Sequence, residues 1–448
     1  MSSKSFNLVL KNKVSPYTKI IEIDSDKSIS IRSFLIGSIC NSKSISKNVL
    51  ESEDVYSTIS CLKKLGVKIV KLKAKTYSIY GKGLGSFYAK KNTKLNFGNS
   101  GTLARLILGI ISTSPGLELK VKGDKSLNKR NMKNLIELLS EFGATFIPLN
   151  KYKFPLKIIS SQMPVGVKYN AGVSAQLKSA VILAGLNSYG HTKIQERFKS
   201  RDHTERMLFN NNQAIKIKNN KKRLIKVSGK RSLNPININV PGDPSSAAFF
   251  VALTLLNKKS KIKIRNVCIN SNRIGFYNLL KEQGAKIKFV NKKKICNELR
   301  SDIIVESCKV KPIKASKKFY TNATDEYPIL FVIAALVKGT SIFKGISDLA
   351  NKESNRIKEM QNILKQLGVN SIFKKDCLKI YGKGLLDAKN KNITVPSLGD
   401  HRICMSSFVL SVLTGAKTII KNFDTVNTSS PSFLKIMKSL GVKFEKRK

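Results

Sequence analysis

The sequence predicts an α/β protein of two similar domains, each built from three repeated units that combine a helix with short strands. The prediction depends on a short pattern that recurs along the 448 residues: an apolar helix ends at a Gly, and a β-branched residue then begins a strand. The ends of these helices are roughly 70 to 85 residues apart, and three fall in each half of the chain. Repeats of this kind bury a core only when several pack together.

Five copies of the pattern are plain, and a sixth is degenerate. The plain copies are residues 62–69, 139–147, 279–287, 363–372 and 436–444, with helix ends at Gly66, Gly143, Gly284, Gly368 and Gly441. The sixth, residues 207–215, has Asn and Gln where the Gly would fall, so we expect its helix to end near Gln213. A second strand is expected after several copies, as at 75–80 and 377–381.

The boundary between the halves is predicted near residues 234–240, where an extended, Pro-containing segment leads to Pro241. The expected domains are residues 20–238, and residues 1–19 together with 239–448. The first strand, at 6–10, is assigned to the second domain because a three-plus-three count otherwise leaves the N-terminus unpaired.

Composition excludes several classes of protein. With 41% hydrophobic residues the chain should be globular, and no apolar run is long enough to span a membrane. Residues 2–13 lack the design of a signal peptide, so we expect a cytoplasmic protein. The seven cysteines include no C-x-x-C pair, which predicts reduced thiols rather than a disulfide scaffold or structural zinc.

The formal net charge of +54 raises the alternative of a basic nucleic-acid-binding protein. The lysines are spread along the whole chain and mixed with Asn, Ile and Ser, the residues that an AT-rich coding sequence supplies. A nucleic-acid binder should concentrate its lysines on one face. We therefore expect no nucleic-acid partner, although the positive field favours anionic small substrates.

Residues 98–105 (GNSGTLAR) lie between an expected strand, 94–97, and an apolar helical run, 103–111. Two glycines, an Asn and a Ser where a helix begins direct several backbone N–H groups at one point, which suits a phosphate or a carboxylate. Similar starts are expected at 24–28, 123–126, 174–178, 241–246, 323–328, 352–356 and 399–402.

These starts have two interpretations. Each has the composition of an ordinary helix N-cap, so the plain one is a set of structural caps. The sharper one is a group of helix N-termini that hold a ligand with several anionic groups, because cationic side chains accompany the caps. Those cations are Lys27, Arg32, Arg130, Lys352, Arg356 and Arg402.

Two carboxylates, Asp325 and Glu353, lie next to basic or cap residues and are candidates for general acid–base chemistry. Alternatively, Asp325 is an N-cap and Glu353 a first-turn acid that complements the helix dipole. The three histidines are not at metal-ligand spacing, and no metal site is expected. We expect His191 in a loop and His203 at a helix start.

Taken together and in order, the motifs resemble the enolpyruvylshikimate-phosphate (EPSP) synthase family. The stretches that carry this resemblance span nearly the whole chain: DKSISIR (26–32), NSGTLAR (99–105), GDKSLNKR (123–130), SAQLKSA (174–180), SRDHTER (200–206), GDPSSAAFF (242–250), TDEYP (324–328), KESNR (352–356) and GDHRICM (399–405).

The resemblance implies two domains, each of three copies of an α/β unit (an inverse α/β barrel), with the active site in the cleft between them. The implied enzyme is a 3-phosphoshikimate 1-carboxyvinyltransferase of the shikimate pathway, which leads to chorismate and the aromatic amino acids. It transfers the enolpyruvyl group of phosphoenolpyruvate to the 5-hydroxyl of shikimate 3-phosphate through a tetrahedral intermediate and releases phosphate. The resemblance further implies a target of glyphosate, and we expect a monomer that needs no cofactor.

The resemblance also implies roles for individual residues. Asp325 would take the proton of the attacking hydroxyl, and Glu353 would handle the proton at the methylene carbon. The residues implied for shikimate 3-phosphate are Lys27, Ser28, Arg32, Ser174, Gln176, Ser200, Arg201, Asp325 and Lys352. Those implied for phosphoenolpyruvate are Lys27, Gly101, Arg130, Gln176, Arg356 and Arg402, and glyphosate occupies the subsite at Gly101 in the family.

The chain departs from the family pattern at a few positions. Ser25, Ala175 and Asn355 stand where Gly, Ser and Asp are frequent, and residues 427–431 contain no Lys where some members place one for phosphoenolpyruvate. A sister family, which transfers enolpyruvyl to UDP-N-acetylglucosamine, is the alternative enzyme. It uses a Cys in the loop at 124–131, and this chain has none there.

Overall fold

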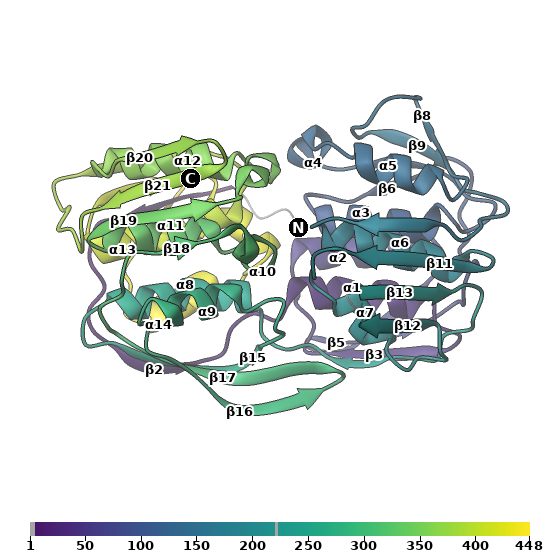
Figure 1. Cartoon of the computed structure of the whole chain (residues 1–448), viewed down its shortest axis with the longest axis horizontal. Coiled ribbons are helices and arrows are strands. Elements are labelled where there is room, and N and C mark those ends of the chain that lie inside the picture. The colour runs from purple at the N-terminus through teal and green to yellow at the C-terminus, as the bar shows by residue number, and fades with distance from the viewer. Residues whose placement is uncertain (1–4, 220–222) are drawn as a thin grey trace. The chain divides into compact units, whose positions relative to one another are not determined.

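The computed structural model describes residues 5–219 and 223–448, which divide into two compact units (Figure 1). Unit 1 contains the N-terminal segment through Asp24, Pro241–Lys293 and Leu299–Lys448. Unit 2 contains Ser25–Val240 together with Lys294–Glu298.

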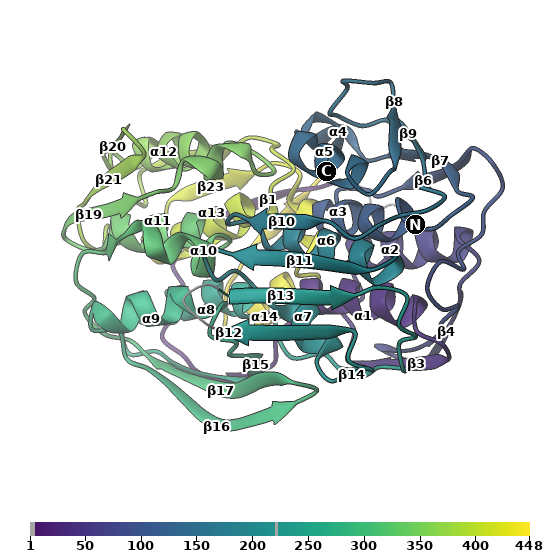
Figure 2. The ribbon, with the colours of Figure 1, turned by 45° about the vertical axis from the view of Figure 1, so that its right-hand side comes forward.

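Within the described residues, each unit contains three four-stranded sheets. In unit 2 they are β14-β3-β5-β4 (Asn237–Asn239, Lys43–Lys47, Thr76–Tyr80, Lys68–Lys73), β6-β7-β9-β8 (Thr93–Asn96, Glu118–Lys122, Leu156–Ile159, Thr145–Ile147) and β10-β11-β13-β12 (Lys168–Ala171, His191–Glu196, Arg223–Ser228, Ile215–Asn219). Figure 2 shows the strands of the last of these side by side.

In unit 1 the sheets are β18-β19-β21-β20 (Lys314–Ala315, Gly339–Lys344, Cys377–Gly382, Ser371–Lys374), β22-β23-β1-β24 (Asn392–Val395, Lys417–Ile420, Asn7–Leu10, Glu445–Arg447) and β16-β17-β15-β2 (Ile287–Ile295, Glu298–Glu306, Lys261–Cys268, Thr18–Ile21). The first strand of the chain therefore pairs with strands near its end, β23 and β24, and both pairs are antiparallel.

The sheets share one design. In the sheet of β6, for example, β6 and β7 are parallel, whereas β9 pairs antiparallel with β7 and with β8. The sheets led by β10, β14, β18 and β22 have the same order of one parallel pair and two antiparallel pairs. The repeated α/β unit that the sequence predicts is thus confirmed.

Two sets of helices fill these units. Nearly every residue is buried in the helices α1 (Lys27–Ser38), α3 (Gly101–Ile111) and α6 (Ala175–Asn187) of unit 2, and in α8 (Pro244–Leu256), α11 (Tyr327–Leu336) and α13 (His401–Thr414) of unit 1. A helix that is apolar on all sides must be enclosed, which explains the long hydrophobic runs of their sequences. Shorter helical elements lie between the strands and the longer helices: α4 (Lys125–Lys129), η1 (Lys317–Phe319), α10 (Tyr320–Ala323), η2 (Ser347–Asn351) and η3 (Phe423–Thr428).

The second set consists of the six repeat helices, α2 (Glu53–Lys64), α5 (Lys133–Ser140), α7 (His203–Leu208), α9 (Gly275–Glu282), α12 (Arg356–Gln366) and α14 (Phe433–Ser439). The five glycines predicted to end them all have positive φ, between 75° and 92°. In the degenerate copy Gln213 has a φ of 52°, so a non-glycine residue adopts the left-handed conformation there. The five helix ends at glycine are confirmed, but the sixth prediction is wrong: α7 ends at Leu208, and Asn210, with a φ of 60°, is the left-handed residue that follows its C-cap.

Candidate functional site

In unit 2, the side chains at the starts of α3 and α6 contact one another. Ser100 caps α3 by accepting a hydrogen bond from the Leu103 amide, as the turn at 98–105 predicts. The amide group of Gln176, in the first turn of α6, donates to the Thr102 hydroxyl at 3.0 Å and accepts from Nη1 of Arg105, also at 3.0 Å. Gln176 therefore lies at the place where a ligand of the α3 N-terminus would bind.

Arg130 and Gly101 meet at the same turn. Arg130 donates through Nη2 to the side-chain carbonyl of Asn99. A methyl group added at Gly101 would lie 2.8 Å from Nη1 of Arg130 and 2.7 Å from Nη1 of Arg105. The missing side chain of Gly101 thus leaves room for two guanidinium groups beside the helix start, where backbone N–H groups also gather. Such a grouping suits an anion.

The start of α1 carries three residues that the resemblance implies for shikimate 3-phosphate. Asp26 caps this helix, and Lys27 forms an ion pair of 3.1 Å with Asp54. The buried guanidinium of Arg32 donates to the Ser28 carbonyl at 3.0 Å and to the Thr204 hydroxyl at 2.9 Å. Arg32 therefore links α1 to α7, the helix that follows Ser200 and Arg201.

Two serines of unit 2 use their hydroxyl groups differently. Ser174 caps α6, and its oxygen accepts from the Leu177 amide, so its hydroxyl hydrogen can still be donated. The Ser200 hydroxyl instead donates to Oε1 of Glu196 at 2.9 Å. The sequence predicts the same role for both serines, but their hydrogen-bonding states differ.

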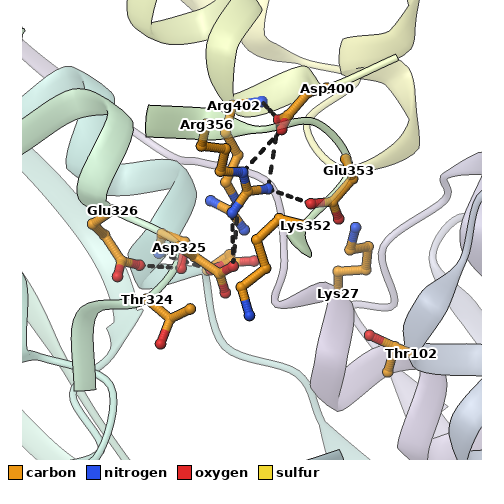
Figure 3. A network of polar contacts seen from close by, with 12 residues as sticks. Lys27, Thr102, Thr324, Asp325, Glu326, Lys352, Glu353, Arg356, Asp400 and Arg402 are labelled. Atoms are coloured by element: carbon orange, nitrogen blue, oxygen red, sulfur yellow. Dashed lines mark hydrogen bonds and ion pairs between the residues drawn. The ribbon is translucent and has the colours of Figure 1, made fainter. Parts of the chain in front are cut away.

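In unit 1 a buried arginine, Arg356, gathers three carboxylates (Figure 3). Its Nε donates to Oδ2 of Asp400 at 2.9 Å, and its Nη2 to Oε2 of Glu353 at 2.5 Å. Its Nη1 lies 3.7 Å from Oδ1 of Asp325. The two carboxylates that the sequence singles out for acid–base chemistry are thus brought to a single guanidinium.

Two more cations belong to this network. Nε of Arg402 lies 3.4 Å from Oδ1 of Asp325, so Asp325 faces two guanidinium groups. Lys352 forms an ion pair of 2.6 Å with Asp348, whose carboxylate also accepts from the Tyr320 hydroxyl. The candidates Asp325, Lys352, Glu353, Arg356 and Arg402 therefore all lie in one region of unit 1.

The electrostatics of Arg356 follow from these contacts. Burial alone would lower the pKa of its guanidinium, but the charges of Asp400, Glu353 and Asp325 outweigh this effect and raise the pKa above its ordinary value. Arg356 is therefore a permanent cation. Its position among carboxylates suits a group that holds an anionic ligand beside proton donors and acceptors.

The plain interpretations of Asp325 and Glu353 as helix-end residues are wrong. Asp325 lies in the turn between α10 and α11, and α11 begins two residues later at Tyr327. Glu353 precedes α12, whose N-cap is Asn355. Both side chains contact Arg356.

The starts of α8 and α11 are joined by buried polar side chains. The Ser245 hydroxyl donates to Glu326, and Arg273 donates to Ser245 at 3.1 Å and to Asp243 at 3.0 Å. For Asp243 the plain interpretation as a cap is confirmed, because its side chain accepts from the Ser245 amide at 2.8 Å. This cluster supports the turn that carries Asp325.

Other outcomes concern single residues. His203 begins α7, as expected. The prediction that His191 lies in a loop is wrong, because this residue begins β11. Reasoning from sequence gave no binding or catalytic role to Asp400, Arg105, Asp348 or Glu196. Asp400 and Arg105 lie inside motifs and could have been found there, whereas Glu196 carries no sequence signal.

The seven cysteines are free thiols. In the described ranges 5–219 and 223–448, no group of three or more His, Cys, Asp or Glu side chains could hold a metal ion. No helix in this part of the chain is both long and apolar enough to cross a membrane.

Comparisons with known proteins agree with the motifs. Residues 11–437 match the family described as EPSP synthase (3-phosphoshikimate 1-carboxyvinyltransferase). The chain is 35% identical to the 3-phosphoshikimate 1-carboxyvinyltransferase of Paramagnetospirillum magneticum over 434 residues, 96% of each protein. It is 38% identical to that of Ruthia magnifica over 423 residues, 94% of this chain and 95% of the relative.

Solved structures agree as well. The EPSP synthase of Acinetobacter baumannii is similar with a TM-score of 0.84 and 31% identity, covering 99% of this chain and all of the other. The enolpyruvyl transferase NikO of Streptomyces tendae has a TM-score of 0.76 at 12% identity and covers 99% of both chains. The second likeness concerns the fold alone, and it supports the two-domain inverse α/β architecture.

Proposed function

The chain belongs to the EPSP synthase family, and we propose that it transfers the enolpyruvyl group of phosphoenolpyruvate to the 5-hydroxyl of shikimate 3-phosphate and releases phosphate. It is a transferase of the shikimate pathway. The observation that carries the proposal for the site is the contact of Asp325 and Glu353 with the same guanidinium, that of Arg356.

The reaction needs an acid and a base. Addition at carbon two of phosphoenolpyruvate requires a proton on its methylene carbon, and the attacking hydroxyl must lose one. Asp325 takes the hydroxyl proton, and Glu353 delivers and later removes the methylene proton. Their position beside a fixed cation supports these roles, because the guanidinium holds each carboxylate in place.

The charges around Arg356 would change when an anionic ligand binds. Arg356 and Arg402 carry two positive charges, whereas Asp325, Glu353 and Asp400 carry three negative ones. An anionic ligand on the two arginines takes contacts from the carboxylates and adds negative charge beside them.

Residues of both units bind the substrates in this proposal. Phosphoenolpyruvate is held by Lys27, Gly101, Arg130, Gln176, Arg356 and Arg402. Shikimate 3-phosphate is held by Lys27, Ser28, Arg32, Ser174, Gln176, Ser200, Arg201, Asp325 and Lys352. Cationic clamps of this kind stabilise the developing charge, and positioning two substrates contributes about 7–11 kcal/mol to lowering the barrier.

We further propose that the domains are residues 20–238, and residues 1–19 with 239–448, and that the enzyme is a cytoplasmic monomer. The free thiols support a reducing compartment. Light scattering measures the mass directly, and a mass of twice 49.8 kDa would contradict the monomer.

A phosphate-release assay tests the function. We expect phosphate only when shikimate 3-phosphate and phosphoenolpyruvate are both present. UDP-N-acetylglucosamine in place of shikimate 3-phosphate serves as the control for the sister family, and release with this acceptor alone would reject the proposal.

A further inference from the structure

A buried cluster of four charged side chains lies in unit 2. The ammonium group of Lys178, on α6, contacts Glu196 at 2.6 Å and Glu205 at 2.8 Å. Arg223, on β13, contacts the same carboxylates at 2.5 and 3.3 Å. The side chain of Lys178 and that of Glu196 have no exposed surface, so this is not a solvated surface network.

The cluster is balanced, with two cations and two carboxylates. Taking charges out of water is costly, and removing one partner of such a set leaves an uncompensated charge in the interior. The four residues come from α6, β11, α7 and β13, which are separate in sequence. The cluster therefore fixes the start of α7 relative to α6, the helix that begins beside Ser174 and Gln176.

One member, Glu196, makes a further set of contacts with Ser200. Oε1 of Glu196 accepts from the Ser200 amide at 3.0 Å and from the Ser200 hydroxyl at 2.9 Å. The Ser200 carbonyl in turn accepts from Lys178 at 3.5 Å. All three polar groups of Ser200 are thus held by the cluster, and Ser200 itself is buried.

The charge state of Glu196 determines which group donates in its hydrogen bond with the Ser200 hydroxyl. Burial alone would raise the pKa of Glu196, but Lys178, the Ser200 amide and Arg223 outweigh it and lower the pKa below its ordinary value. An ionised carboxylate only accepts hydrogen bonds, so the Ser200 hydroxyl must be the donor. The bond is charge-assisted and therefore stronger than one between neutral groups.

We propose that Glu196 is a positioning residue of the shikimate 3-phosphate site, which fixes Ser200 and so presents the next residue, Arg201, to the phosphate group. This inference rests on the proposed function, in which Ser200 and Arg201 bind shikimate 3-phosphate. Glu196 acts through Ser200 and not on the substrate. In this proposal Arg201 makes the contact with the phosphate group, because the Ser200 hydroxyl already donates to Glu196.

The chain offers a matched control, Glu205. Glu205→Gln removes one negative charge from the same cluster, with the same contacts to Lys178 and Arg223 affected, but Glu205 does not hold Ser200. Glu196→Gln removes the charge and weakens the anchor of Ser200 as well. A difference in ligand affinity between the two variants therefore measures the effect of the hydrogen bonds between Glu196 and Ser200, and not the effect of losing a buried charge.

Calorimetric titration of the full chain with shikimate 3-phosphate, and separately with shikimate, is the test. We expect Glu196→Gln to raise the Kd for shikimate 3-phosphate at least tenfold, to change the Kd for shikimate less than twofold, and to leave the KM for phosphoenolpyruvate unchanged. Glu205→Gln should change the Kd for shikimate 3-phosphate less than twofold. Equal losses in the two variants, or an unchanged or tighter Kd in Glu196→Gln, would overturn the inference.

Ser200→Ala keeps the proposal testable if Glu196→Gln does not fold, because it removes only the hydroxyl. It should weaken shikimate 3-phosphate and not shikimate. In the double variant Glu196→Gln/Ser200→Ala the losses should not add, since both act through one bond. Additive losses would contradict the inference. Wild-type protein that binds no shikimate 3-phosphate would instead reject the proposed function.

Discussion

Arg356 donates a hydrogen bond from Nε to Oδ2 of Asp400, and this bond sets the plane of the guanidinium that Glu353 and Asp325 contact. Asp400 is fully buried and also caps α13 by accepting from the Arg402 amide at 3.0 Å. Asp400 thus contacts two of the three arginines that we assign to phosphoenolpyruvate, Arg356 through its guanidinium and Arg402 through its backbone amide.

The substitution Asp400→Asn distinguishes the capping of α13 from the ionic contact with Arg356. Asn is as good an N-cap as Asp, so α13 should persist, but the ionic contact with Arg356 is lost. A hydrogen bond to a charged group is worth about 1.5–3 kcal/mol, which predicts a KM for phosphoenolpyruvate roughly 10- to 100-fold higher. Asp124→Asn, at the cap of α4, is the control and should change it less than twofold. Steady-state kinetics decides, and similar KM values in both variants would rule out the orienting role.

Asp325→Ala and Glu353→Ala should each lower kcat by about 10²–10⁴-fold, the usual contribution of a general acid or base, while the melting temperature stays close to that of wild type. Glu359→Ala is the control, because Glu359 is a carboxylate in the first turn of α12, next to the same motif. Turnover within tenfold of wild type in either variant removes that residue from the chemistry.

Arg402→Ala should raise the KM for phosphoenolpyruvate far more than the KM for shikimate 3-phosphate. Arg402 contacts Asp325 but is assigned to phosphoenolpyruvate alone. Varying each substrate at saturation of the other gives both constants. Equal increases in the two KM values would contradict the assignment.

Gly101→Ala should fold normally and weaken both phosphoenolpyruvate and glyphosate. The added methyl group meets the ends of two flexible side chains, Arg105 at 2.7 Å and Arg130 at 2.8 Å, which can move but then leave their positions at the helix start. Gly172→Ala, whose methyl group meets nothing within 4 Å, is the control. An inhibition constant for glyphosate equal to that of wild type would be the contrary result.

The lowered pKa of Glu196 predicts a pH dependence of stability. A carboxyl group whose pKa is lower in the folded state stabilises that state at pH values above its unfolded pKa of 4.5, and the contribution is lost as the pH falls through the lower folded value. The difference in free energy of unfolding between wild type and Glu196→Gln should therefore be largest above about pH 5 and shrink as the pH falls further. Urea unfolding at a series of pH values measures it, and a constant difference would show that the group does not titrate between the two states.

The repeats could be predicted from sequence because their signal is local. A left-handed residue at Gly66 or Gly441 follows from the helix that precedes it, whereas in the degenerate copy, which has no Gly, the helix ends earlier and Asn210 adopts this conformation. The contact of Arg356 with Asp400 could not be predicted in this way, since 44 residues separate the partners. The same holds for Glu196, whose importance comes from what the fold packs around it.

The lysines are scattered along the chain and form no sequence motif. Their number suggests a polyanion partner, yet several form local ion pairs, such as Lys71 with Glu51 and Lys261 with Glu306. The cations of the candidate site differ from the other basic residues of the chain in their carboxylate neighbours. Arg356 is one of 82 basic residues, and its three carboxylate contacts set it apart.

The position of β1 has a consequence for the order in which the protein is made. β1 lies between β23 and β24, so its sheet can be completed only after these two strands have been synthesised. Nearly all of unit 2 is one continuous segment, Ser25–Val240, and can fold while synthesis continues. Unit 1, which contains β1 and both of its partner strands, is therefore completed later in synthesis than unit 2.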